Sequence, residues 1–531
     1  MMNWQSVWQK RPLPPLLLIL LLAFGLRLIG LDSQSLWWDE LKTIQRAAMA
    51  FPHLMTDLAG HRAHLPLYFM VMQLWHGLGE SAFVVRFFSV IWGVVGIAGI
   101  FQLGKHIANK RVGLLAALLL AISPFYIWYS QEARMYSFLP ALLILAHWAL
   151  AVAIQKKKLL PWLLYALLMI AAVATHYFSL FVIIAHYIFF VLHFRQLRPQ
   201  TIRWFLTMLL VGLCLLPLAW FVFTSGNGEA IATVPAWIAS IQWSDPLLTI
   251  WNFSIGPGIG LGEWYGYSAT AVFLFAFVIA MRPARRRKTD QVTYSSLFVR
   301  LFIIWFSLPL GLTFLVSLNW PFLPDNPFSL YLDRYLIISL PPFLLMVAWG
   351  IDDWATKPST RFAAAKRWLQ SGFILMAMVI SGISIWQLNH NPNHLRNDWR
   401  SALERINEYP TNNTVVLGQQ DIVLPIDYYG DTEIVYVQLP PPDGAAISTS
   451  YIAAIRQQIE TAVQHSPTAW HIEPFYNHDT HQFPETRRQQ LANDSESMAQ
   501  SWLMANFTML AQHRLPGIRL TLFELEAGLQ N

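Results

Sequence analysis

The sequence contains little charge and almost no cysteine. Only 12% of its 531 residues are charged, against roughly 25% in soluble domains, whereas 55% are hydrophobic. The one cysteine, Cys214, lies in an apolar run, so the chain has no disulfide framework. Apolar runs of about 20 residues, the length that a helix needs to cross a bilayer, recur along most of the chain. The composition excludes a soluble globular protein and predicts a polytopic membrane protein.

Basic residues are concentrated in every second connection between the apolar runs. The formal net charge is +6 and the sequence pI is about 9.3, values that a nucleic-acid-binding protein also has. About twenty basic residues lie in one set of connections and only about five in the other short ones, which is the positive-inside pattern. The positive charge therefore orients helices in a membrane and does not indicate a nucleic-acid partner.

The alternating charge predicts eleven spans with the C-terminal segment on the outer side of the membrane. The first run follows Lys10 and Arg11 without a small-x-small cleavage site, as in a retained signal anchor. Two shorter apolar segments in the first outer loop predict helices that lie in the membrane interface, 51–58 and 64–79. The eleven expected spans are 13–31, 82–104, 112–130, 137–154, 159–175, 177–193, 203–223, 267–281, 297–318, 335–351 and 369–387.

Residues 388–531 differ in composition from the rest. Lysine is absent there, and charged and amide side chains are more frequent. The stretch TVVLGQQDIVLPIDYYG (414–430) is typical of a strand, a turn and the start of a helix, with Pro425 in the first helical turn. The chain is therefore expected to have two domains, a transmembrane domain over 1–387 and a small extracytoplasmic α/β domain over 388–531.

Ionisable and aromatic residues gather in the connections that this topology places outside. Membrane proteins rarely collect so many ionisable groups at one surface unless they handle a polar or charged substrate there. Carboxylates act as general bases, and arginines offer forked donors that match phosphate. The residues are Asp39 and Glu40 in WWDE, His64 and Tyr68 in HLPLYF, Glu132, Arg134 and Tyr136 in SPFYIWYSQEARMYSF, His176 and Tyr177 in THY, Arg334 and Tyr335 in LDRYL, and the segment NDWRSAL (397–403).

These motifs, in this order and on one face, resemble those of the GT-C membrane glycosyltransferases. The resemblance covers roughly residues 10–405 and is nearest to bacterial relatives of the protein O-mannosyltransferases and lipid A aminoarabinose transferases. It implies an all-α polytopic bundle with about eleven transmembrane helices, interfacial helices in the first outer loop, and the C-terminal α/β domain outside. It also implies a polyprenyl-phosphate-linked sugar donor and transfer to a hydroxyl, usually with inversion.

Carried over residue by residue, the resemblance assigns the catalytic carboxylate to Asp39, with Glu40 beside it. Donor phosphate binding falls to Arg134, His64 and Arg334; some relatives have lysine near the position of His64, so the protonation state of His64 matters. The expected substrate pocket adds Glu132, Tyr136, Tyr68, His176, Tyr177 and Tyr335. No spacing identifies a metal site or a cofactor, although Glu40 or Glu132 is suited to help hold a divalent cation. The expected partners are the lipid-linked sugar, membrane lipids, and a lipid, glycan or protein hydroxyl acceptor. The expected location is the bacterial inner membrane.

Several alternatives stay open at this point. Trp37 and Trp38 are typical of aromatic residues at the membrane interface, and Asp39 and Glu40 are also compatible with an interfacial pair that binds nothing. A transporter or lipid flippase is the rival class, although such proteins commonly have internal repeats and ionisable residues near the bilayer midplane. The chain has no repeat, and His147 and His186 are the midplane candidates. A ligase of lipid-linked glycans is a further enzyme alternative.

Overall fold

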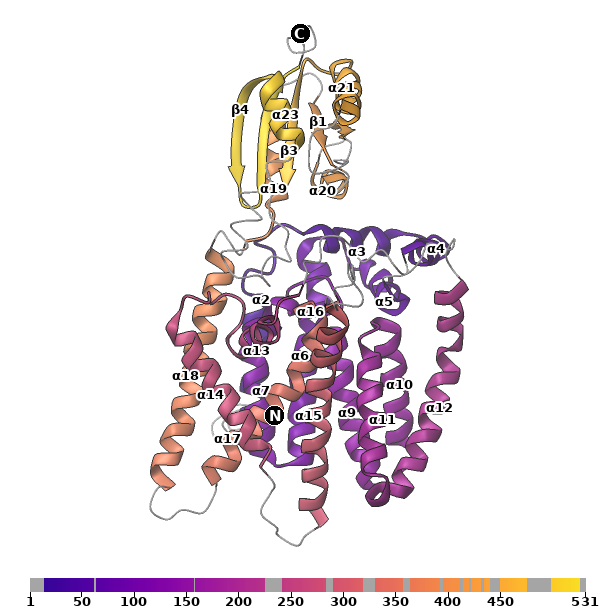
Figure 1. Ribbon diagram of the computed structural model, residues 1–531, viewed down its shortest axis with the longest axis vertical. Coiled ribbons are helices and arrows are strands. Elements are labelled where there is room, and N and C mark those ends of the chain that lie inside the picture. Colours follow the sequence, from indigo (N-terminus) through magenta and orange to yellow (C-terminus); the bar gives the residue numbers. More distant parts are fainter. Residues whose placement is uncertain are drawn as a thin grey trace, which may run out of the picture. The chain divides into compact units, whose positions relative to one another are not determined.

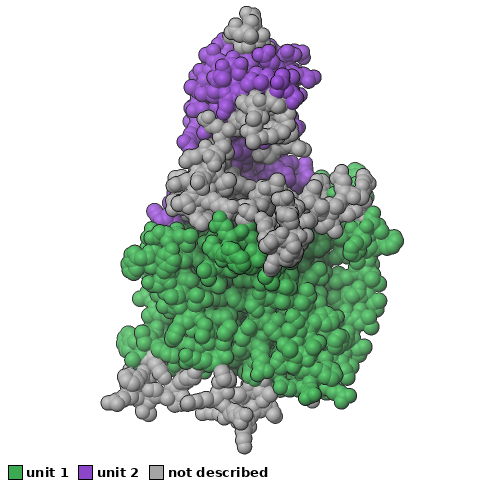
Figure 2. Space-filling model, viewed as in Figure 1, with its two compact units in different colours: residues 1–31, 46–385 green, residues 32–45, 386–531 purple. Residues whose placement is uncertain are grey.

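The chain divides into two compact units (Figure 2). Unit 1 contains residues 1–31 and 46–385, and unit 2 contains residues 32–45 and 386–531. Residues 32–45 thus group with the C-terminal part of the chain. The computed structural model describes residues 14–61, 64–156, 158–224, 241–282, 290–318, 330–356, 363–391, 395–409, 414–419, 422–430, 434–439, 449–474 and 498–525.

Unit 1 is helical, and a helix coincides with each of the eleven apolar stretches (Figure 1). Six helices are long and apolar enough to cross a membrane, α7 and α8 qualify together as a bent pair, and α2, α10, α11 and α14 are shorter apolar helices. The number and direction of the spans stay a prediction. The helices are α2 (Pro15–Leu28), α4 (Phe51–His61), α5 (Pro66–His76), α6 (Ala82–Ile107), α7 (Lys110–Ile122), α8 (Pro124–Ser130), α9 (Phe138–Lys156), α10 (Leu159–Thr175), α11 (Ser179–Leu192), α12 (Phe194–Thr224), α13 (Asp245–Ile255), α14 (Trp264–Ala280), α15 (Asp290–Ser317), α16 (Asp333–Leu336), η1 (Ile337–Ser339), α17 (Leu340–Thr356) and α18 (Ala363–His390).

The expected continuous span over 112–130 is broken, and the expectation was wrong in this respect. α7 ends at Ile122 and α8 begins at Pro124, with a bend of 62° between them. Proline cannot donate to the preceding turn, and the Ser123 hydroxyl accepts the N–H of Tyr126, which caps the new helix. The break brings the chain after α8 into a short turn, residues 131–137, which contains two of the expected site residues.

Arg27, a buried residue of α2, stabilises this break. Its guanidinium donates to the carbonyls of Ala121 at 3.1 Å and Leu120 at 3.3 Å, at the C-terminal end of α7. A cation is favourable at this end of a helix because the last carbonyl groups are otherwise unsatisfied. Its guanidinium carbon also lies 5.2 Å from the centroid of the Tyr126 ring in α8. Arg27 therefore fixes both sides of the bend.

Gly350 marks a close approach of two unit 1 helices, α14 and α17. A Cβ at Gly350 would overlap the backbone carbonyl of Ala276, which no side-chain rotation can relieve. We expect Gly350→Ala to destabilise the protein by about 1–3 kcal/mol or more, as overpacking does. The measurement is thermal unfolding of the detergent-solubilised protein. Gly372→Ala is the matched control, since that Cβ would meet nothing within 4 Å, and equal melting temperatures of the two variants would contradict the prediction.

Unit 2 contains a five-stranded sheet with helices on both faces, so the expected small α/β domain is present. The strand order is β2-β1-β3-β5-β4, with β1 parallel to β2 and β3, and β5 antiparallel to β3 and β4. The expected strand, turn and helix of 414–430 are β1 and α20. The elements are α19 (Trp399–Asn407), β1 (Thr414–Gly418), α20 (Val423–Tyr429), β2 (Ile434–Gln438), α21 (Thr449–Val463), β3 (Thr468–Pro474), α23 (Met498–Asn506), β4 (Thr508–Leu515) and β5 (Ile518–Glu524).

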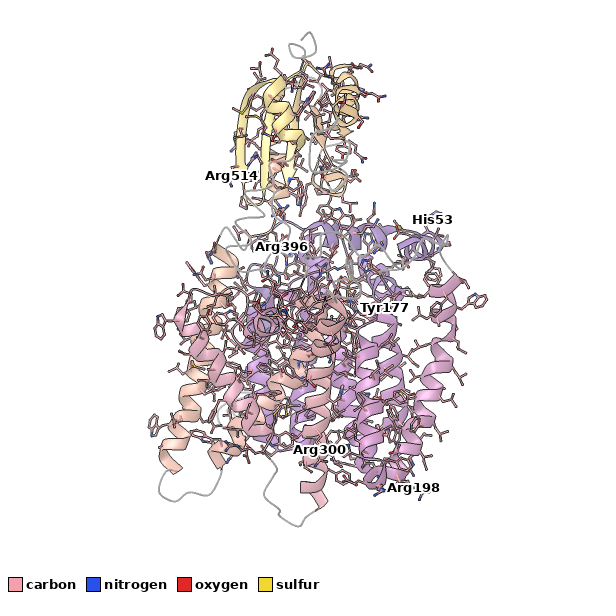
Figure 3. All side chains as sticks on the ribbon, in the orientation of Figure 1. His53, Tyr177, Arg198, Arg300, Arg396 and Arg514 are labelled. Carbon is pink, nitrogen blue, oxygen red and sulfur yellow. The ribbon has the colours of Figure 1, made fainter. Side chains whose placement is uncertain are left out.

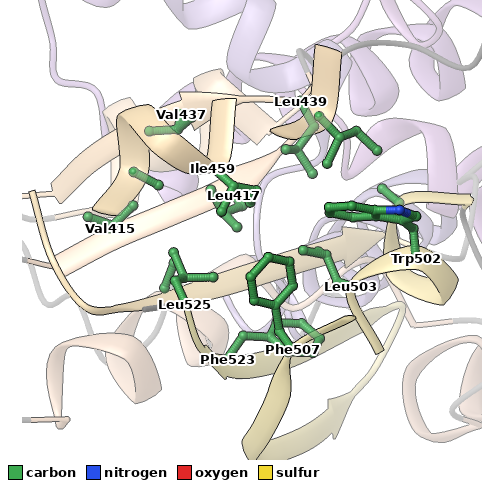
Figure 4. Packing of buried hydrophobic residues seen from close by; sticks show 14 residues of the cluster. Val415, Leu417, Val437, Leu439, Ile459, Trp502, Leu503, Phe507, Phe523 and Leu525 are labelled. Atoms are coloured by element: carbon green, nitrogen blue, oxygen red, sulfur yellow. The ribbon is translucent and has the colours of Figure 1, made fainter. Parts of the chain in front are cut away.

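Alternation of side chains along the strands gives unit 2 two hydrophobic cores. Val415 and Leu417 of β1 face α21 and α23, where they pack with Ile459 and Trp502 (Figure 4). Val416, between them, belongs to the opposite core with α19 and α20. Successive strand residues point to opposite faces, so one short apolar run serves both cores.

The helix α3 (Trp38–Ala48) carries the first motif and runs through the boundary between the units at Gln45 and Arg46. The sequence pattern did not predict this helix. Nor did it predict α13, which lies within the expected outer loop 224–266. Each is 11 residues long and too short to stand out as a span.

Candidate functional site

Most of the expected site residues lie at one end of unit 1. Figure 3 labels Tyr177 at this end of the helices, whereas Arg198 and Arg300 lie at the opposite end. Arg134 lies in the turn between α8 and α9, His64 precedes α5, His176 follows α10, and Arg334 is the second residue of α16. Segments that are far apart in the sequence thus present their basic residues at the same end of the helices.

Arg134 and Arg334 approach the same aromatic ring. The guanidinium carbon of each lies 6.0 Å from the centroid of the Tyr136 ring, and both side chains are buried. The guanidinium carbon of Arg334 is also 5.4 Å from the Tyr335 ring. Forked guanidinium donors match the oxygens of phosphate and carboxylate groups, so two guanidinium groups beside one ring suit an anionic ligand.

His64 and Arg46 both approach the ring of Phe69. The imidazole of His64 lies 5.6 Å from the Phe69 ring, centroid to centroid. The guanidinium carbon of Arg46 lies 4.8 Å from the centroid of the same Phe69 ring. The Nε of Arg46 donates to the carboxylate of Asp57 at 2.7 Å. Arg46 was not among the residues predicted from the sequence, although it lies seven residues after Asp39 and so on the same side of an amphipathic helix.

Burial and neighbouring arginines lower the pKa values of His64 and His176. Burial lowers the pKa of His64 well below its usual value, and Arg134, Arg46, His176 and Arg334 lower it further. Burial, with Arg134 and Arg334, likewise lowers the pKa of His176 to about 3. Both imidazoles are therefore neutral at pH 7. We define the basic cluster as Arg46, His64, Arg134, His176 and Arg334.

Aromatic rings line the basic cluster. Tyr335 lies 5.1 Å from His176 and 6.4 Å from Tyr136, ring centroid to ring centroid. Tyr68 is fully buried and packs 5.5 Å from Phe69. Tyr177 is half-buried in the turn after His176. Five of the six expected pocket residues are thus aromatic. His176 belongs to the cluster, and three others lie against the cluster or Phe69, namely Tyr136, Tyr335 and Tyr68.

Glu132, the sixth expected pocket residue, is fully buried in the turn 131–137. Its backbone carbonyl accepts the N–H of Arg134 at 2.8 Å, which tightens the turn. The Ser89 hydroxyl donates to the carbonyl of Arg134 at 3.2 Å. Across the described ranges, no group of three or more His, Cys, Asp or Glu side chains is arranged to hold a metal ion.

Asp333 fixes the helix that carries Arg334. Its carboxylate accepts hydrogen bonds of 2.5 Å from both the Thr249 hydroxyl and the Asn252 amide of α13. The hydroxyl groups of Tyr331 and Thr249 lie 2.9 Å apart, which adds a further link to the same helix. The unpredicted helix α13 therefore holds the start of α16, and Asp333 has a structural role as an acceptor.

In unit 2, Asp39 and Glu40 have different surroundings. The Glu40 carboxylate is fully buried, pairs with Arg396 Nη1 at 2.9 Å, and accepts the backbone N–H of Trp37 at 3.3 Å. Asp39 is half-buried in the first turn of α3, where the helix dipole favours a carboxylate. Glu40 thus has a structural partner in Arg396, and its catalytic assignment stays a prediction. The catalytic role of Asp39 also stays a prediction.

The neutral state of His64 gives a prediction. We expect His64→Gln to retain most activity at pH 7, because an amide replaces a neutral imidazole rather than a cation. The pKa of His64 is lowered, so charge develops only well below pH 6.5, and donor binding should not titrate with this group between pH 6 and 8. The measurement is the pH profile of kcat/KM for both proteins. A wild-type inflection near pH 6.5 that the variant lacks would contradict it.

Comparisons with known proteins show what the chain is similar to. Residues 63–221 match the family model described as dolichyl-phosphate-mannose-protein mannosyltransferase. No curated protein matches the chain. The matched range 63–221 includes three members of the basic cluster, His64, Arg134 and His176.

Solved structures match nearly the whole chain. ArnT from Cupriavidus metallidurans in the apo state has a TM-score of 0.53 and 12% identity, covering 98% of this chain and 98% of its own. ArnT bound to undecaprenyl phosphate has a TM-score of 0.52 and 12% identity, covering 95% and 97%. Oligosaccharyltransferase AglB from Archaeoglobus fulgidus, in complex with an inhibitory peptide and a dolichol-phosphate, has a TM-score of 0.50 and 11% identity, covering 98% and 74%. The chain is therefore an integral membrane protein with the GT-C fold of membrane glycosyltransferases.

Proposed function

We propose that the chain is a glycosyltransferase that moves a sugar from a polyprenyl-phosphate-linked donor to a hydroxyl acceptor on the extracytoplasmic side. The approach of Arg134 and Arg334 to one ring, beside His64, carries the proposal. Forked guanidinium donors match phosphate oxygens. Two similar structures are described with undecaprenyl phosphate or a dolichol-phosphate, which supports a lipid phosphate as the anion.

In the proposed reaction, Asp39 takes the proton of the acceptor hydroxyl as its oxygen attacks the anomeric carbon. The bond between that carbon and the phosphate oxygen breaks, so the sugar is transferred with inversion and polyprenyl phosphate leaves. The phosphate changes from a diester to a monoester and gains negative charge. Arg134 and Arg334 stabilise that extra charge, and donors aimed at developing charge commonly supply the largest catalytic contribution. A positioned base adds about 10²–10⁴-fold.

The rival transporter function would need ionisable groups inside the bundle. His147 and His186 are buried in α9 and α11 with their Nε2 atoms 3.1 Å apart. If His147 Nδ1–H donates to the Leu143 carbonyl at 2.7 Å, His147 Nε2 must accept from His186. His186 Nδ1 then accepts from the Tyr165 hydroxyl at 2.8 Å. This neutral hydrogen-bonded chain favours a structural role over ion transport.

The sidedness of the protein gives another prediction. We expect the C-terminal unit to lie outside the cytoplasm, because eleven spans from a basic, inner N terminus end there. A cysteine at Gln457, an exposed residue of α21, should react with a membrane-impermeant thiol reagent in intact spheroplasts. The native Cys214, on the apolar helix α12, serves as background in the unsubstituted protein. Labelling that requires permeabilised inner membranes would reverse the proposed orientation.

The function itself is tested with purified protein in detergent, where no second compartment exists. The protein is supplied with a panel of polyprenyl-phosphate monosaccharides, a lipid-linked oligosaccharide and candidate hydroxyl acceptors, and products are identified by mass spectrometry. We expect one donor to be consumed and its sugar to appear on an acceptor. Consumption of only a lipid-linked oligosaccharide would identify the ligase alternative. Transport in vesicles without any consumption in detergent would identify the flippase alternative.

A further inference from the structure

The segment that carries Asp39 is bonded to residues near the other end of the sequence. The Ser35 hydroxyl donates to Asp398 at 3.2 Å, and the Leu36 N–H donates to the Tyr429 hydroxyl at 2.8 Å. Ser35 and Asp398 are 363 positions apart in the chain, and Leu36 and Tyr429 are 393 apart. All these residues belong to unit 2. The start of α3 is therefore part of the C-terminal unit rather than a free loop.

Glu40 is the central contact of this attachment. It is the third residue of α3, and its carboxylate reaches back to the N–H of Trp37, just before the helix, as glutamate does in a capping box. The same oxygen accepts from Arg396 Nη1 at 2.9 Å. Arg396 also donates its backbone N–H to the side chain of Gln34 at 3.1 Å. One arginine thus contacts the chain on both sides of the helix start.

Burial of the Glu40–Arg396 ion pair keeps the start of α3 in a fixed position. The Glu40 side chain is 0% exposed and that of Arg396 is 4% exposed. A buried pair resists separation because each charge would otherwise lie unpaired in a medium of low polarity. Asp39 immediately precedes Glu40 in the same helical turn, so the direction of its carboxylate depends on how that turn is held.

We propose that Arg396, with Tyr429, is a positioning residue for catalysis: the C-terminal unit orients Asp39 by holding Glu40 and the start of α3. This inference rests on the proposed function of Asp39. It gives the C-terminal unit a role that its own sheet does not reveal. Arg396 does not contact the substrate in this account and acts only through Glu40.

The test compares Arg396→Gln, Arg396→Lys and Tyr429→Phe in the full-length protein. Small displacements of a catalytic group cost much in rate, so kcat should fall about 10–100-fold in Arg396→Gln with the donor KM unchanged. Arg396→Lys should recover part of kcat by restoring the charge, and Tyr429→Phe should lower it less. Arg405→Gln is the control, since Arg405 forms an exposed pair with Glu408 in the same unit. An unchanged kcat in Arg396→Gln, or a rise in KM alone, would overturn the proposal.

Hydrogen exchange separates this inference from the proposed function. Amides of residues 36–41 should exchange faster in Arg396→Gln and Tyr429→Phe than in the wild type, whereas Arg405→Gln should not change them. Unchanged exchange in Arg396→Gln and Tyr429→Phe would overturn the proposal that these residues hold the start of α3, even if kcat fell. If the wild type turns over no lipid-phosphate sugar, the proposed function fails. Faster exchange in Arg396→Gln and Tyr429→Phe would still show that these two residues hold the start of α3.

Discussion

Asp39→Asn is expected to abolish sugar transfer while donor binding persists. The amide has the size of the carboxylate but cannot take the acceptor proton, so the variant loses about 3–5 kcal/mol of transition-state stabilisation. The phosphate-binding groups are unchanged, so affinity for the lipid donor should stay close to that of the wild type. The measurements are turnover with the preferred donor and equilibrium binding of that donor to the purified variant.

Asp32→Asn is the matched control for Asp39→Asn. Asp32 lies in the same segment, is half-exposed and pairs with Arg400 at 3.3 Å, so the change should cost at most about 1 kcal/mol of stability and little activity. Glu40→Gln should behave differently again, because it leaves Arg396 buried without its carboxylate and lowers stability. Small and equal effects of Asp39→Asn and Asp32→Asn would show that Asp39 is not the base.

Arg134→Lys is expected to retain the fold but to lower kcat/KM by about 10²–10³-fold, as loss of a transition-state donor does. A lysine keeps the charge but cannot make a two-pronged contact with phosphate oxygens. The loss should be equal for every donor sugar, because the lipid phosphate is common to all of them. The measurement is kcat/KM for two donors that differ only in the sugar.

Arg198→Lys provides the comparison for this variant, because Arg198 is exposed at the opposite end of unit 1 (Figure 3). It should keep wild-type turnover. Wild-type turnover in Arg134→Lys as well would return Arg134 to a structural role, such as fixing the turn between α8 and α9. A loss that depends on the sugar would place Arg134 near the sugar rather than the phosphate.

The sequence predicted the features that depend on local pattern. Length and apolarity locate α10 and α11 closely, because the bilayer imposes the length of an apolar helix. The short β-branched run VVLG (415–418) likewise located β1. The WWDE and EARMY motifs indicated Asp39 and Arg134 through their resemblance to a known family, and the roles of both stay proposals.

The remaining features depend on contacts between distant parts of the chain. No local pattern pairs Glu40 with Arg396, which is 356 positions away, or Asp333 with Asn252. The sequence did not predict Arg46 as a site residue, because an arginine on an amphipathic helix is ordinarily exposed. The tertiary structure instead buries Arg46 against Phe69. The division of α3 between two units also arises from the tertiary structure, since the helix itself is continuous.

The most direct test of the central claim follows the donor phosphate by phosphorus NMR during turnover. We expect the phosphodiester signal of the lipid-linked sugar to convert into the monoester signal of polyprenyl phosphate, with one sugar transferred for each monoester formed. The wild type should show this conversion, and Asp39→Asn should bind the donor without it. A phosphate that moves to the acceptor together with the sugar, or a diester signal that never changes with any donor, would contradict the account.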